Sequence, residues 1–325
     1  MSVHSTPVLT TTADALLRSV SRSFYLSIRF LPTRLREPVA FGYLLARTTD
    51  TVADTAHIPR LVRMETLRQL FSAIQDGSVP NAIIDLANSF APLQQTGAER
   101  ALIEALPQTL HGLQKMRAED RADIRDVLAN ITRGQMLDLQ RFDSSELRAL
   151  ETAADLDEYT YLVAGSVGEF WTRLCFRYVH NFSRRSETEM VALGKDYGMG
   201  LQLINVLRDA GPDLRAGRCY FPQEQLRAAG ITPADILREP QRFQSIYEYW
   251  IDKAEAAVAA GIQYSTAIQN RRVRAATMLP ALIGQRTLAL LREAGANALQ
   301  RAIKVPRTEV RCMILRAFFA GPQRK

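Results

Sequence analysis

One stretch of the chain carries four polar side chains with a regular spacing. Tyr43, Arg47, Asp50 and Asp54 follow one another at intervals of four, three and four residues. On a helix this spacing places them on one face. The residues around that face are apolar, namely Val39, Ala40, Leu44, Leu45 and Val52. We therefore expect the two carboxylates where helices pack, where like charges need either a hard divalent cation or a neighbouring arginine such as Arg47.

A second carboxylate pair follows roughly 160 residues later, a separation that two facing helices of one bundle would allow. Gln202, Asn205, Asp209 and Asp213 share one helical register within a stretch rich in Leu, Ile and Val. Mg²⁺ typically binds one or two carboxylates together with phosphate oxygens of a substrate. The arginines available near the two pairs are Arg47, Arg208 and Arg218. Paired aspartates with arginines beside them predict a clamp that ionises a diphosphate.

The elements that position these residues are expected to be helices. Apolar residues recur every three or four positions, as at Leu279, Leu282 and Ile283, and strand-like alternation is lacking. Proline and glycine divide the chain into about ten to thirteen helices with short loops. No linker and no repeat separates two halves. We therefore expect one all-α domain over residues 1–325, with residues 1–12 disordered.

Composition excludes several classes of protein. The 325 residues are 47% hydrophobic, and they carry a formal net charge of +7 at pH 7. No apolar run reaches the length of a membrane span, and the N-terminus does not resemble a secretory signal. The three cysteines are far apart and form no zinc motif. We expect a cytoplasmic protein that binds no nucleic acid, because neither a helix-turn-helix nor an aromatic-basic pattern accompanies the charge.

Six ordered motifs resemble those of the squalene and phytoene synthase family of head-to-head prenyltransferases. They are Ser21–Phe24, Tyr43–Asp54, Gly134–Leu139, Tyr159–Gly168, Gln202–Asp213 and Arg218–Pro222. The resemblance implies a single-domain isoprenoid-synthase helical bundle with a central cavity.

The resemblance also implies roles for individual residues. Asp50, Asp54, Asp209 and Asp213 would hold Mg²⁺ on the diphosphates, and Tyr43 and Tyr159 would lie close to the developing carbocation. Catalysis and substrate binding would further involve Arg47, Ser21, Arg22, Ser23, Phe24, Gln202, Asn205, Arg208 and Arg218. Val163, Gly165 and Gly168 would keep one helix face small, so that a prenyl chain can lie against it. The alternative for the two glycines is close helix packing, and for Tyr161, Phe170 and Trp171 core packing is favoured.

The chain departs from the family pattern at a few positions. Ala53 and Pro212 stand where squalene synthases usually carry glutamate, and Gln135 replaces a methionine of the central motif. Proline has no N–H and clashes with the preceding helical turn, so we expect the helix to end or kink at Pro212. Ala276 stands where an aromatic residue precedes a proline in squalene synthases.

Local resemblances favour the squalene synthase branch. The first aspartate motif, Phe221–Glu224 and Ala302–Arg307 are similar to elements of that branch. They imply condensation of two farnesyl diphosphates through presqualene diphosphate, followed by reduction to squalene, with Lys304 and Arg307 close to the phosphates of NADPH. Solvated basic residues are the alternative for these two. Peripheral contact with a membrane is a further hypothesis.

Three other functions remain open. The chain could stop at an unreduced product, as dehydrosqualene and phytoene synthases do. It could perform only one step, giving presqualene diphosphate or a hydroxylated C30 alcohol. It could also be a helical scaffold without catalysis, although the four retained aspartates argue against this. The sequence leaves the oligomeric state open.

Overall fold

The computed structural model describes residues 11–20, 25, 28–29, 31–76, 81–142 and 146–319. The predicted substrate element Ser21–Phe24 lies outside the described residues, as do residues 1–10 of the segment that we expected to be disordered. Helix α1 begins at Thr11, so Thr11 and Thr12 belong to a helix.

The chain folds into two compact units, which are described separately. Unit 1 consists of Met1–Leu139 with Arg177–His180, and unit 2 consists of Gln140–Phe176 with Asn181–Lys325. The expectation of a single catalytic domain stays a prediction.

Unit 1 is built of helices around the long helix α3. Its elements are α1 (Thr11–Val20), α3 (Thr33–Asp54), α4 (Arg60–Asp76), α5 (Asn81–Phe90), η1 (Ala91–Leu93), α6 (Gly97–Glu104), α7 (Leu106–Lys115) and most of α8 (Ala118–Arg141). Leu44, Leu45 and Val52 of α3 are buried, as the sequence predicted. Leu67 and Leu70 of α4 are buried as well, whereas Leu61 is exposed. The apolar side of α3 thus belongs to the core, and its polar side carries the first aspartate motif.

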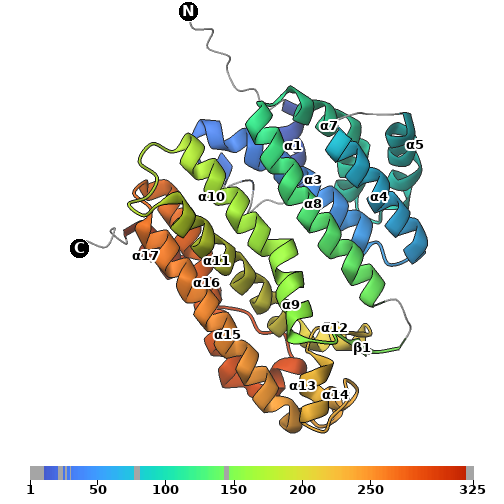
Figure 1. Ribbon diagram of the computed structural model, residues 1–325, viewed down its shortest axis with the longest axis vertical. Coiled ribbons are helices and arrows are strands. Elements are labelled where there is room, and N and C mark those ends of the chain that lie inside the picture. Colours follow the sequence, from blue (N-terminus) through green and yellow to red (C-terminus); the bar gives the residue numbers. More distant parts are fainter. Residues whose placement is uncertain are drawn as a thin grey trace, which may run out of the picture. The chain divides into compact units, whose positions relative to one another are not determined.

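Unit 2 contains longer helices and two very short strands. Its elements are β1 (Arg148–Ala149), α9 (Ala153–Thr160), η2 (Tyr161–Gly165), α10 (Ser166–Tyr178), α11 (Glu187–Arg208), α12 (Ala210–Arg215), β2 (Arg218–Cys219), α13 (Gln223–Ala228), α14 (Asp235–Arg238), α15 (Pro240–Ala267), α16 (Arg271–Ala294), η3 (Gly295–Leu299) and α17 (Arg307–Phe319). The last two residues of α10, Arg177 and Tyr178, belong to unit 1. Figure 1 shows α11, α15 and α16 side by side within unit 2.

The core of unit 2 is aromatic. Phe243, Tyr247 and Trp250 of α15 are fully buried, and Phe221 packs edge-on against Phe243 with ring centroids 4.7 Å apart. Aromatic side chains bury a large apolar area each, so this cluster supplies much of the packing of the unit. It holds Phe221 in place just after β2, within the Arg218–Pro222 motif.

Side-chain caps fix where the site-bearing helices begin. Ser186 and Glu189 form a reciprocal capping box at the start of α11, and Thr152 and Asp155 form another at the start of α9. Each box satisfies backbone N–H groups that the first helical turn leaves without partners. Because each helix starts at a fixed residue, the side on which each later side chain of α9 and α11 lies is fixed as well.

The all-α prediction is confirmed. Among the described residues, β1 and β2 are the only paired strands, and they pair in parallel over two residues each. The helices outnumber the predicted ten to thirteen, because short helices such as α12, α13 and α14 lie between the long ones. No helix in the described ranges is long and apolar enough to cross a membrane.

Candidate active site

The first aspartate motif lies on α3 in unit 1. Tyr43, Arg47 and Asp50 are partly buried, and Asp54 is the exposed last residue of the helix. Arg47 Nη1 donates to Asp50 Oδ2 at 2.5 Å. The shared helix face that the spacing predicted is therefore present, and an arginine compensates one of its carboxylates.

Arg47 also contacts a carboxylate that the sequence analysis missed. Its Nη2 lies 3.5 Å from Glu99 Oε1 in the first turn of α6. Thr96, the N-cap of that helix, donates its hydroxyl to Glu99 Oε2 at 2.9 Å. A threonine three residues before a glutamate is a recognisable helix start, but it does not reveal which helix lies beside α3.

Burial dominates the electrostatics of Asp50. Loss of solvent raises the pKa of this carboxyl, the neighbouring Arg47 guanidinium lowers it, and Glu99 raises it further. A carboxylate held in this way is poorly compensated by the protein alone. An additional cation would stabilise its charged form.

The second aspartate motif lies in unit 2, where the helix breaks. α11 ends at Arg208, Asp209 has φ −96° and ψ 7°, and α12 begins at Ala210. The prediction of a break at Pro212 was wrong in position, because the chain leaves the helix one turn earlier. Pro212 instead sits in the first turn of α12, where a backbone N–H would have no helical acceptor and its loss costs little.

Each carboxylate of the second motif has an arginine partner. Arg208 binds Asp209 with both ends of its guanidinium, through Nε at 2.9 Å and Nη2 at 2.6 Å. Arg218 Nη2 donates to Asp213 Oδ1 at 2.8 Å. The hydrogen bond to Asp209 raises the pKa of Arg208. Both predicted phosphate-binding arginines therefore lie at the carboxylates, as expected.

Asp213 is the more buried of the two acids, with 16% of its side chain exposed. Burial raises the pKa of its carboxyl; Arg218 opposes this shift, and the nearby charge of Asp209 adds to it. The backbone N–H of Asp213 still donates to the Asp209 carbonyl oxygen at 2.9 Å, so the break at Asp209 does not carry Asp213 away from the motif.

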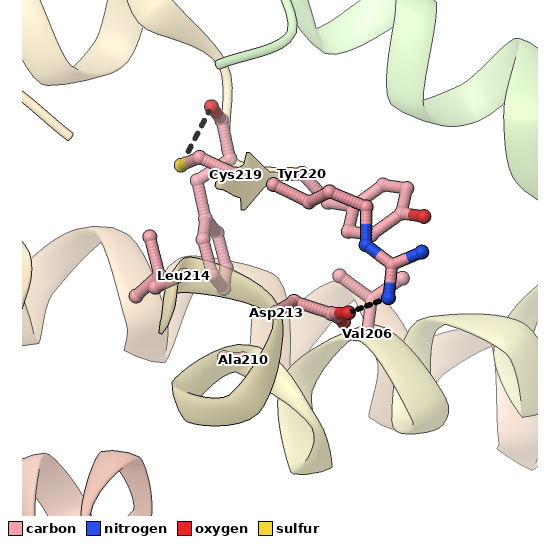
Figure 2. Close-up of a pocket in the computed structure, with 8 residues that line it drawn as sticks. Val206, Ala210, Asp213, Leu214, Cys219 and Tyr220 are labelled. Carbon is pink, nitrogen blue, oxygen red and sulfur yellow. Dashed lines mark hydrogen bonds and ion pairs between the residues drawn. The ribbon is translucent and has the colours of Figure 1, made fainter. Parts of the chain in front are cut away.

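A small pocket opens beside this pair in unit 2. Figure 2 shows Asp213 and Tyr220 among the side chains that line it, and Arg218, which binds Asp213, belongs to the same lining. Its lining residues are Val206, Ala210, Asp213, Leu214, Arg218, Cys219, Tyr220 and Phe221. The pocket is too narrow to hold a water molecule in this structure, so it shows which side chains surround the ion pair and is not itself a substrate cavity.

Tyr159 is held next to the second motif. Its ring stacks on Tyr220 with centroids 5.0 Å apart and planes inclined by 28°. Gln202 Nε2 donates to the Tyr159 hydroxyl at 3.4 Å, and Asn205 Nδ2 donates to Gln202 Oε1 at 3.2 Å. The predicted residues Tyr159, Gln202 and Asn205 are thus brought together within unit 2.

The small residues of the Tyr159–Gly168 motif lie against α11. A Cβ atom added at Gly168 would lie 2.5 Å from the carbonyl carbon of Gly194 and closer still to its oxygen, and one at Gly165 would lie 2.9 Å from Met199 Cγ. Close helix packing, the alternative kept for these glycines, therefore accounts for both. Val163 and Tyr161 are partly buried, and Phe170 is in the core.

The predicted nucleotide-binding residues lie elsewhere in unit 2. Lys304 and Arg307 are exposed, before and at the start of α17. Ile303 beside them is buried and packs into the main core of the unit. The two cations are accessible to an anion from solvent, and their role stays a prediction.

The acidic residues offer hard oxygen donors. In the described ranges no three or more His, Cys, Asp or Glu side chains gather as they would around a protein-bound metal ion. Each aspartate motif instead supplies two carboxylates, the donor set that Mg²⁺ uses when the remaining ligands come from water and substrate phosphates. The residues fit Mg²⁺ bound together with a diphosphate.

Comparison with known proteins points to one family. A family model described as squalene/phytoene synthase matches residues 17–309. The chain is 27% identical over 316 residues to presqualene diphosphate synthase of Rhodopseudomonas palustris, covering 96% of this chain and 94% of that protein. It is 29% identical over 215 residues to squalene synthase ERG9 of Saccharomyces cerevisiae, covering 64% of this chain and 44% of that protein. The chain is 28% identical over 248 residues to a bifunctional lycopene cyclase/phytoene synthase of Phaeosphaeria nodorum. This match covers 74% of this chain but only 39% of that protein.

Solved structures share the fold. The complex of TcSQS with the ligand E5700 aligns with a TM-score of 0.76 at 21% identity, covering 94% of this chain and 85% of that one. Squalene synthase HpnC from Alicyclobacillus acidocaldarius aligns with a TM-score of 0.62 at 22% identity, covering 87% of this chain and 92% of that one. At these identities the likeness concerns the fold alone.

Proposed function

Because the chain belongs to the squalene/phytoene synthase family, we propose that it joins two farnesyl diphosphate molecules head to head to give presqualene diphosphate. One diphosphate and one proton leave as the new carbon–carbon bonds form. The observation that carries this proposal is the pairing of Arg208 with Asp209 and of Arg218 with Asp213, next to the stacked rings of Tyr159 and Tyr220. The end-to-end match to a presqualene diphosphate synthase supports it.

Each aspartate motif would serve one diphosphate group. Asp50 and Asp54 in unit 1, and Asp209 and Asp213 in unit 2, would hold Mg²⁺, which when bound neutralises charge on the departing diphosphate. Arg47, Arg208 and Arg218 would donate hydrogen bonds to phosphate oxygens. A guanidinium presents several N–H groups in a fixed plane and suits this task.

The tyrosines would act on the hydrocarbon side of the reaction. The ring of Tyr159 stacks on Tyr220 and its hydroxyl accepts from Gln202, so both the ring and the oxygen have fixed positions. A ring face stabilises a nearby cation through its quadrupole, and the oxygen can accept a proton. Tyr43 on α3 would have the same role at the first motif.

Reduction to squalene is a second candidate for the complete reaction. It requires hydride from NADPH to reach the cation that forms when the second diphosphate leaves. The exposed cations Lys304 and Arg307 favour it, because two basic side chains near one helix start suit the phosphates of a nucleotide. The unreduced products of dehydrosqualene and phytoene synthases are the outcomes expected if hydride is not delivered.

Contact with a membrane is also proposed, through α17. Ile314 and Leu315 are exposed there, with 37% and 60% of their surface accessible, and Arg311 and Arg316 on the same helix are exposed as well. Exposed apolar side chains between arginines suit a bilayer with anionic headgroups. Such contact would give an apolar substrate and product a short path to the lipid phase.

Product analysis with purified protein tests the function. Farnesyl diphosphate and Mg²⁺ are supplied with and without NADPH, and lipids and diphosphates are identified by mass spectrometry. Presqualene diphosphate in both reactions supports the proposal, and squalene appearing only with NADPH adds the second candidate. Dehydrosqualene as the sole product, or no consumption of farnesyl diphosphate, contradicts it.

Two variants separate catalysis from scaffolding. Asp50→Asn and Asp213→Asn each remove one carboxylate charge while keeping the side-chain volume. Both should abolish turnover without lowering the melting temperature. A non-catalytic scaffold would instead show no turnover in the parent protein, and full activity in either variant would remove that motif from the mechanism.

A further inference from the structure

The helix that carries Tyr159 contains a single π-turn. α9, η2 and α10 follow one another without interruption, and η2 spans Tyr161–Gly165. The backbone N–H of Ser166 donates to the carbonyl of Tyr161, five residues earlier. In a regular α-helix that N–H would bind the carbonyl of Leu162. The π-turn therefore takes the usual backbone donor away from Leu162.

The side chain of Ser166 replaces this donor. Its Oγ donates to the Leu162 carbonyl oxygen at 2.8 Å. Ser166 is 3% exposed and Leu162 is 2% exposed, so water is largely kept from this site. A buried carbonyl without a hydrogen-bond donor is destabilising, because it has given up its hydrogen bonds to water without replacing them. The hydroxyl therefore favours the π-turn over a regular helix.

The π-turn changes which side of the helix the later residues occupy. Tyr159 and Gly168 are nine positions apart, which on a regular α-helix places them on opposite sides, about 180° apart. One residue inserted by a π-turn reduces the angle to about 80°. Both residues do face α11, since Tyr159 accepts from Gln202 and Gly168 lies against Gly194. Only the interrupted helix satisfies both contacts.

We propose that Ser166 is a positioning residue, whose hydroxyl holds the π-turn that directs Tyr159 toward Gln202 and Tyr220 beside the second aspartate motif. This rests on the proposed function for its catalytic consequence, but its structural content is independent of it. The hydroxyl touches neither carboxylate of the motif. It acts by fixing the rotation of α9 relative to the part of α10 that is packed on α11.

Three variants test the proposal. Ser166→Ala removes one oxygen atom and should let the helix return to regular i to i−4 hydrogen bonds. Ser166→Thr keeps a hydroxyl that can donate to the same carbonyl and should restore the parent behaviour. Thr160→Val is the control, because it removes a buried hydroxyl that donates to the Asp157 carbonyl at 3.0 Å before the π-turn begins.

The first measurement is the structure of each variant. In Ser166→Ala we expect the π-turn to be lost and the Tyr159 ring to leave Tyr220. In Ser166→Thr and Thr160→Val both features should remain. A Ser166→Ala structure that retains the π-turn and the stacked rings overturns the proposal, whatever reaction the enzyme performs.

The second measurement is kinetic. Misplacing a catalytic group by about 1 Å can lower a rate by up to a hundredfold, so Ser166→Ala should lower kcat by about tenfold to a hundredfold with little change in KM. Ser166→Thr and Thr160→Val should stay within about twofold of the parent. Equal losses of kcat in Ser166→Ala and Thr160→Val would overturn the positioning role. A parent protein without turnover would refute the proposed function, and the structures would still decide the role of the hydroxyl.

Discussion

Gly168→Ala should be among the most damaging small substitutions in unit 2. The added Cβ would lie 2.5 Å from the carbonyl carbon of Gly194, whereas carbon atoms in favourable contact are about 3.5–4.0 Å apart. The obstacle is the backbone of α11, which cannot rotate away as a side chain can. The two helices would have to separate by about 1 Å at their crossing.

The expected magnitude follows from this geometry. Overpacking a well-packed interior typically costs about 1–3 kcal/mol, and a clash with backbone belongs at the upper end of that range. A loss of about 3 kcal/mol lowers the melting temperature by roughly 4 °C if the 325 residues unfold together, since the unfolding entropy is about 2.1 cal/mol/K per residue. Gly194→Ala should cost less, because its Cβ would lie 3.3 Å from the carbonyl carbon of Gly168 and 2.9 Å from its oxygen, and the nearest atom, the Thr172 hydroxyl at 2.6 Å, belongs to a side chain.

Gly97→Ala is the matched control. A Cβ at Gly97, the first residue of α6, would meet no atom within 4 Å. This variant should be neutral or stabilising by up to about 1 kcal/mol, because alanine restricts the unfolded chain. Circular dichroism should give the highest melting temperature for Gly97→Ala, a lower one for Gly194→Ala and the lowest for Gly168→Ala. A Gly168→Ala protein as stable as Gly97→Ala would refute the close packing of α10 on α11.

The remaining predictions concern charge and surface. Asp213→Asn should keep or raise the melting temperature at pH 7. Burial raises the folded-state pKa of the Asp213 carboxyl, so this group contributes stability below its unfolded pKa and that contribution is lost as pH rises through the folded pKa. Asparagine stays neutral at every pH and does not lose it. Melting curves from pH 4 to 8 should show a smaller decline for the variant, and a lower melting temperature at pH 7 would contradict the assignment. Arg177→Ala leaves Asp120 and Asp123 without the guanidinium that contacts them at 2.7 and 2.6 Å, and should cost about 3 kcal/mol in urea unfolding. Arg68→Ala, which breaks an exposed ion pair with Glu65, should lower the free energy of unfolding by at most about 1 kcal/mol. Equal losses in Arg177→Ala and Arg68→Ala would refute the argument from burial. Leu315→Ser should weaken co-flotation with anionic vesicles while Leu61→Ser, an exposed leucine on α4, should not; equal binding by both would remove α17 as the contact.

Sequence periodicity was sufficient for the fold class and for the faces of the site-bearing helices. The interval from Tyr43 to Asp54 required a helix with one polar side, and the apolar residues around it are buried in α3. A spacing of this kind depends only on local backbone geometry, so it can be read without knowing the neighbours. The arginine partners of Asp209 and Asp213 were likewise expected, because they lie within five residues of them.

Features that depend on tertiary contacts were not predicted. Glu99 reaches Arg47 from α6, and nothing in the local sequence states which helix lies beside α3. The break at Asp209 was placed at Pro212, because proline is the visible disruptor, whereas a short helix can accept proline in its first turn. The π-turn at Tyr161–Gly165 depends on a buried serine bond and on packing against α11.

The ion pairs of the second aspartate motif pair each of its carboxylates with an arginine of the same unit. Arg208 binds Asp209 and Arg218 binds Asp213, so each acid has a counter-charge from the chain itself, although Arg218 does not fully offset the burial of Asp213. An anion that takes either guanidinium must first compete with the carboxylate that already holds it. Each such exchange frees a carboxylate at the moment when negative charge arrives. Ligand affinity is then set by the difference between two sets of contacts, and a cation and an anion should each bind more tightly in the presence of the other.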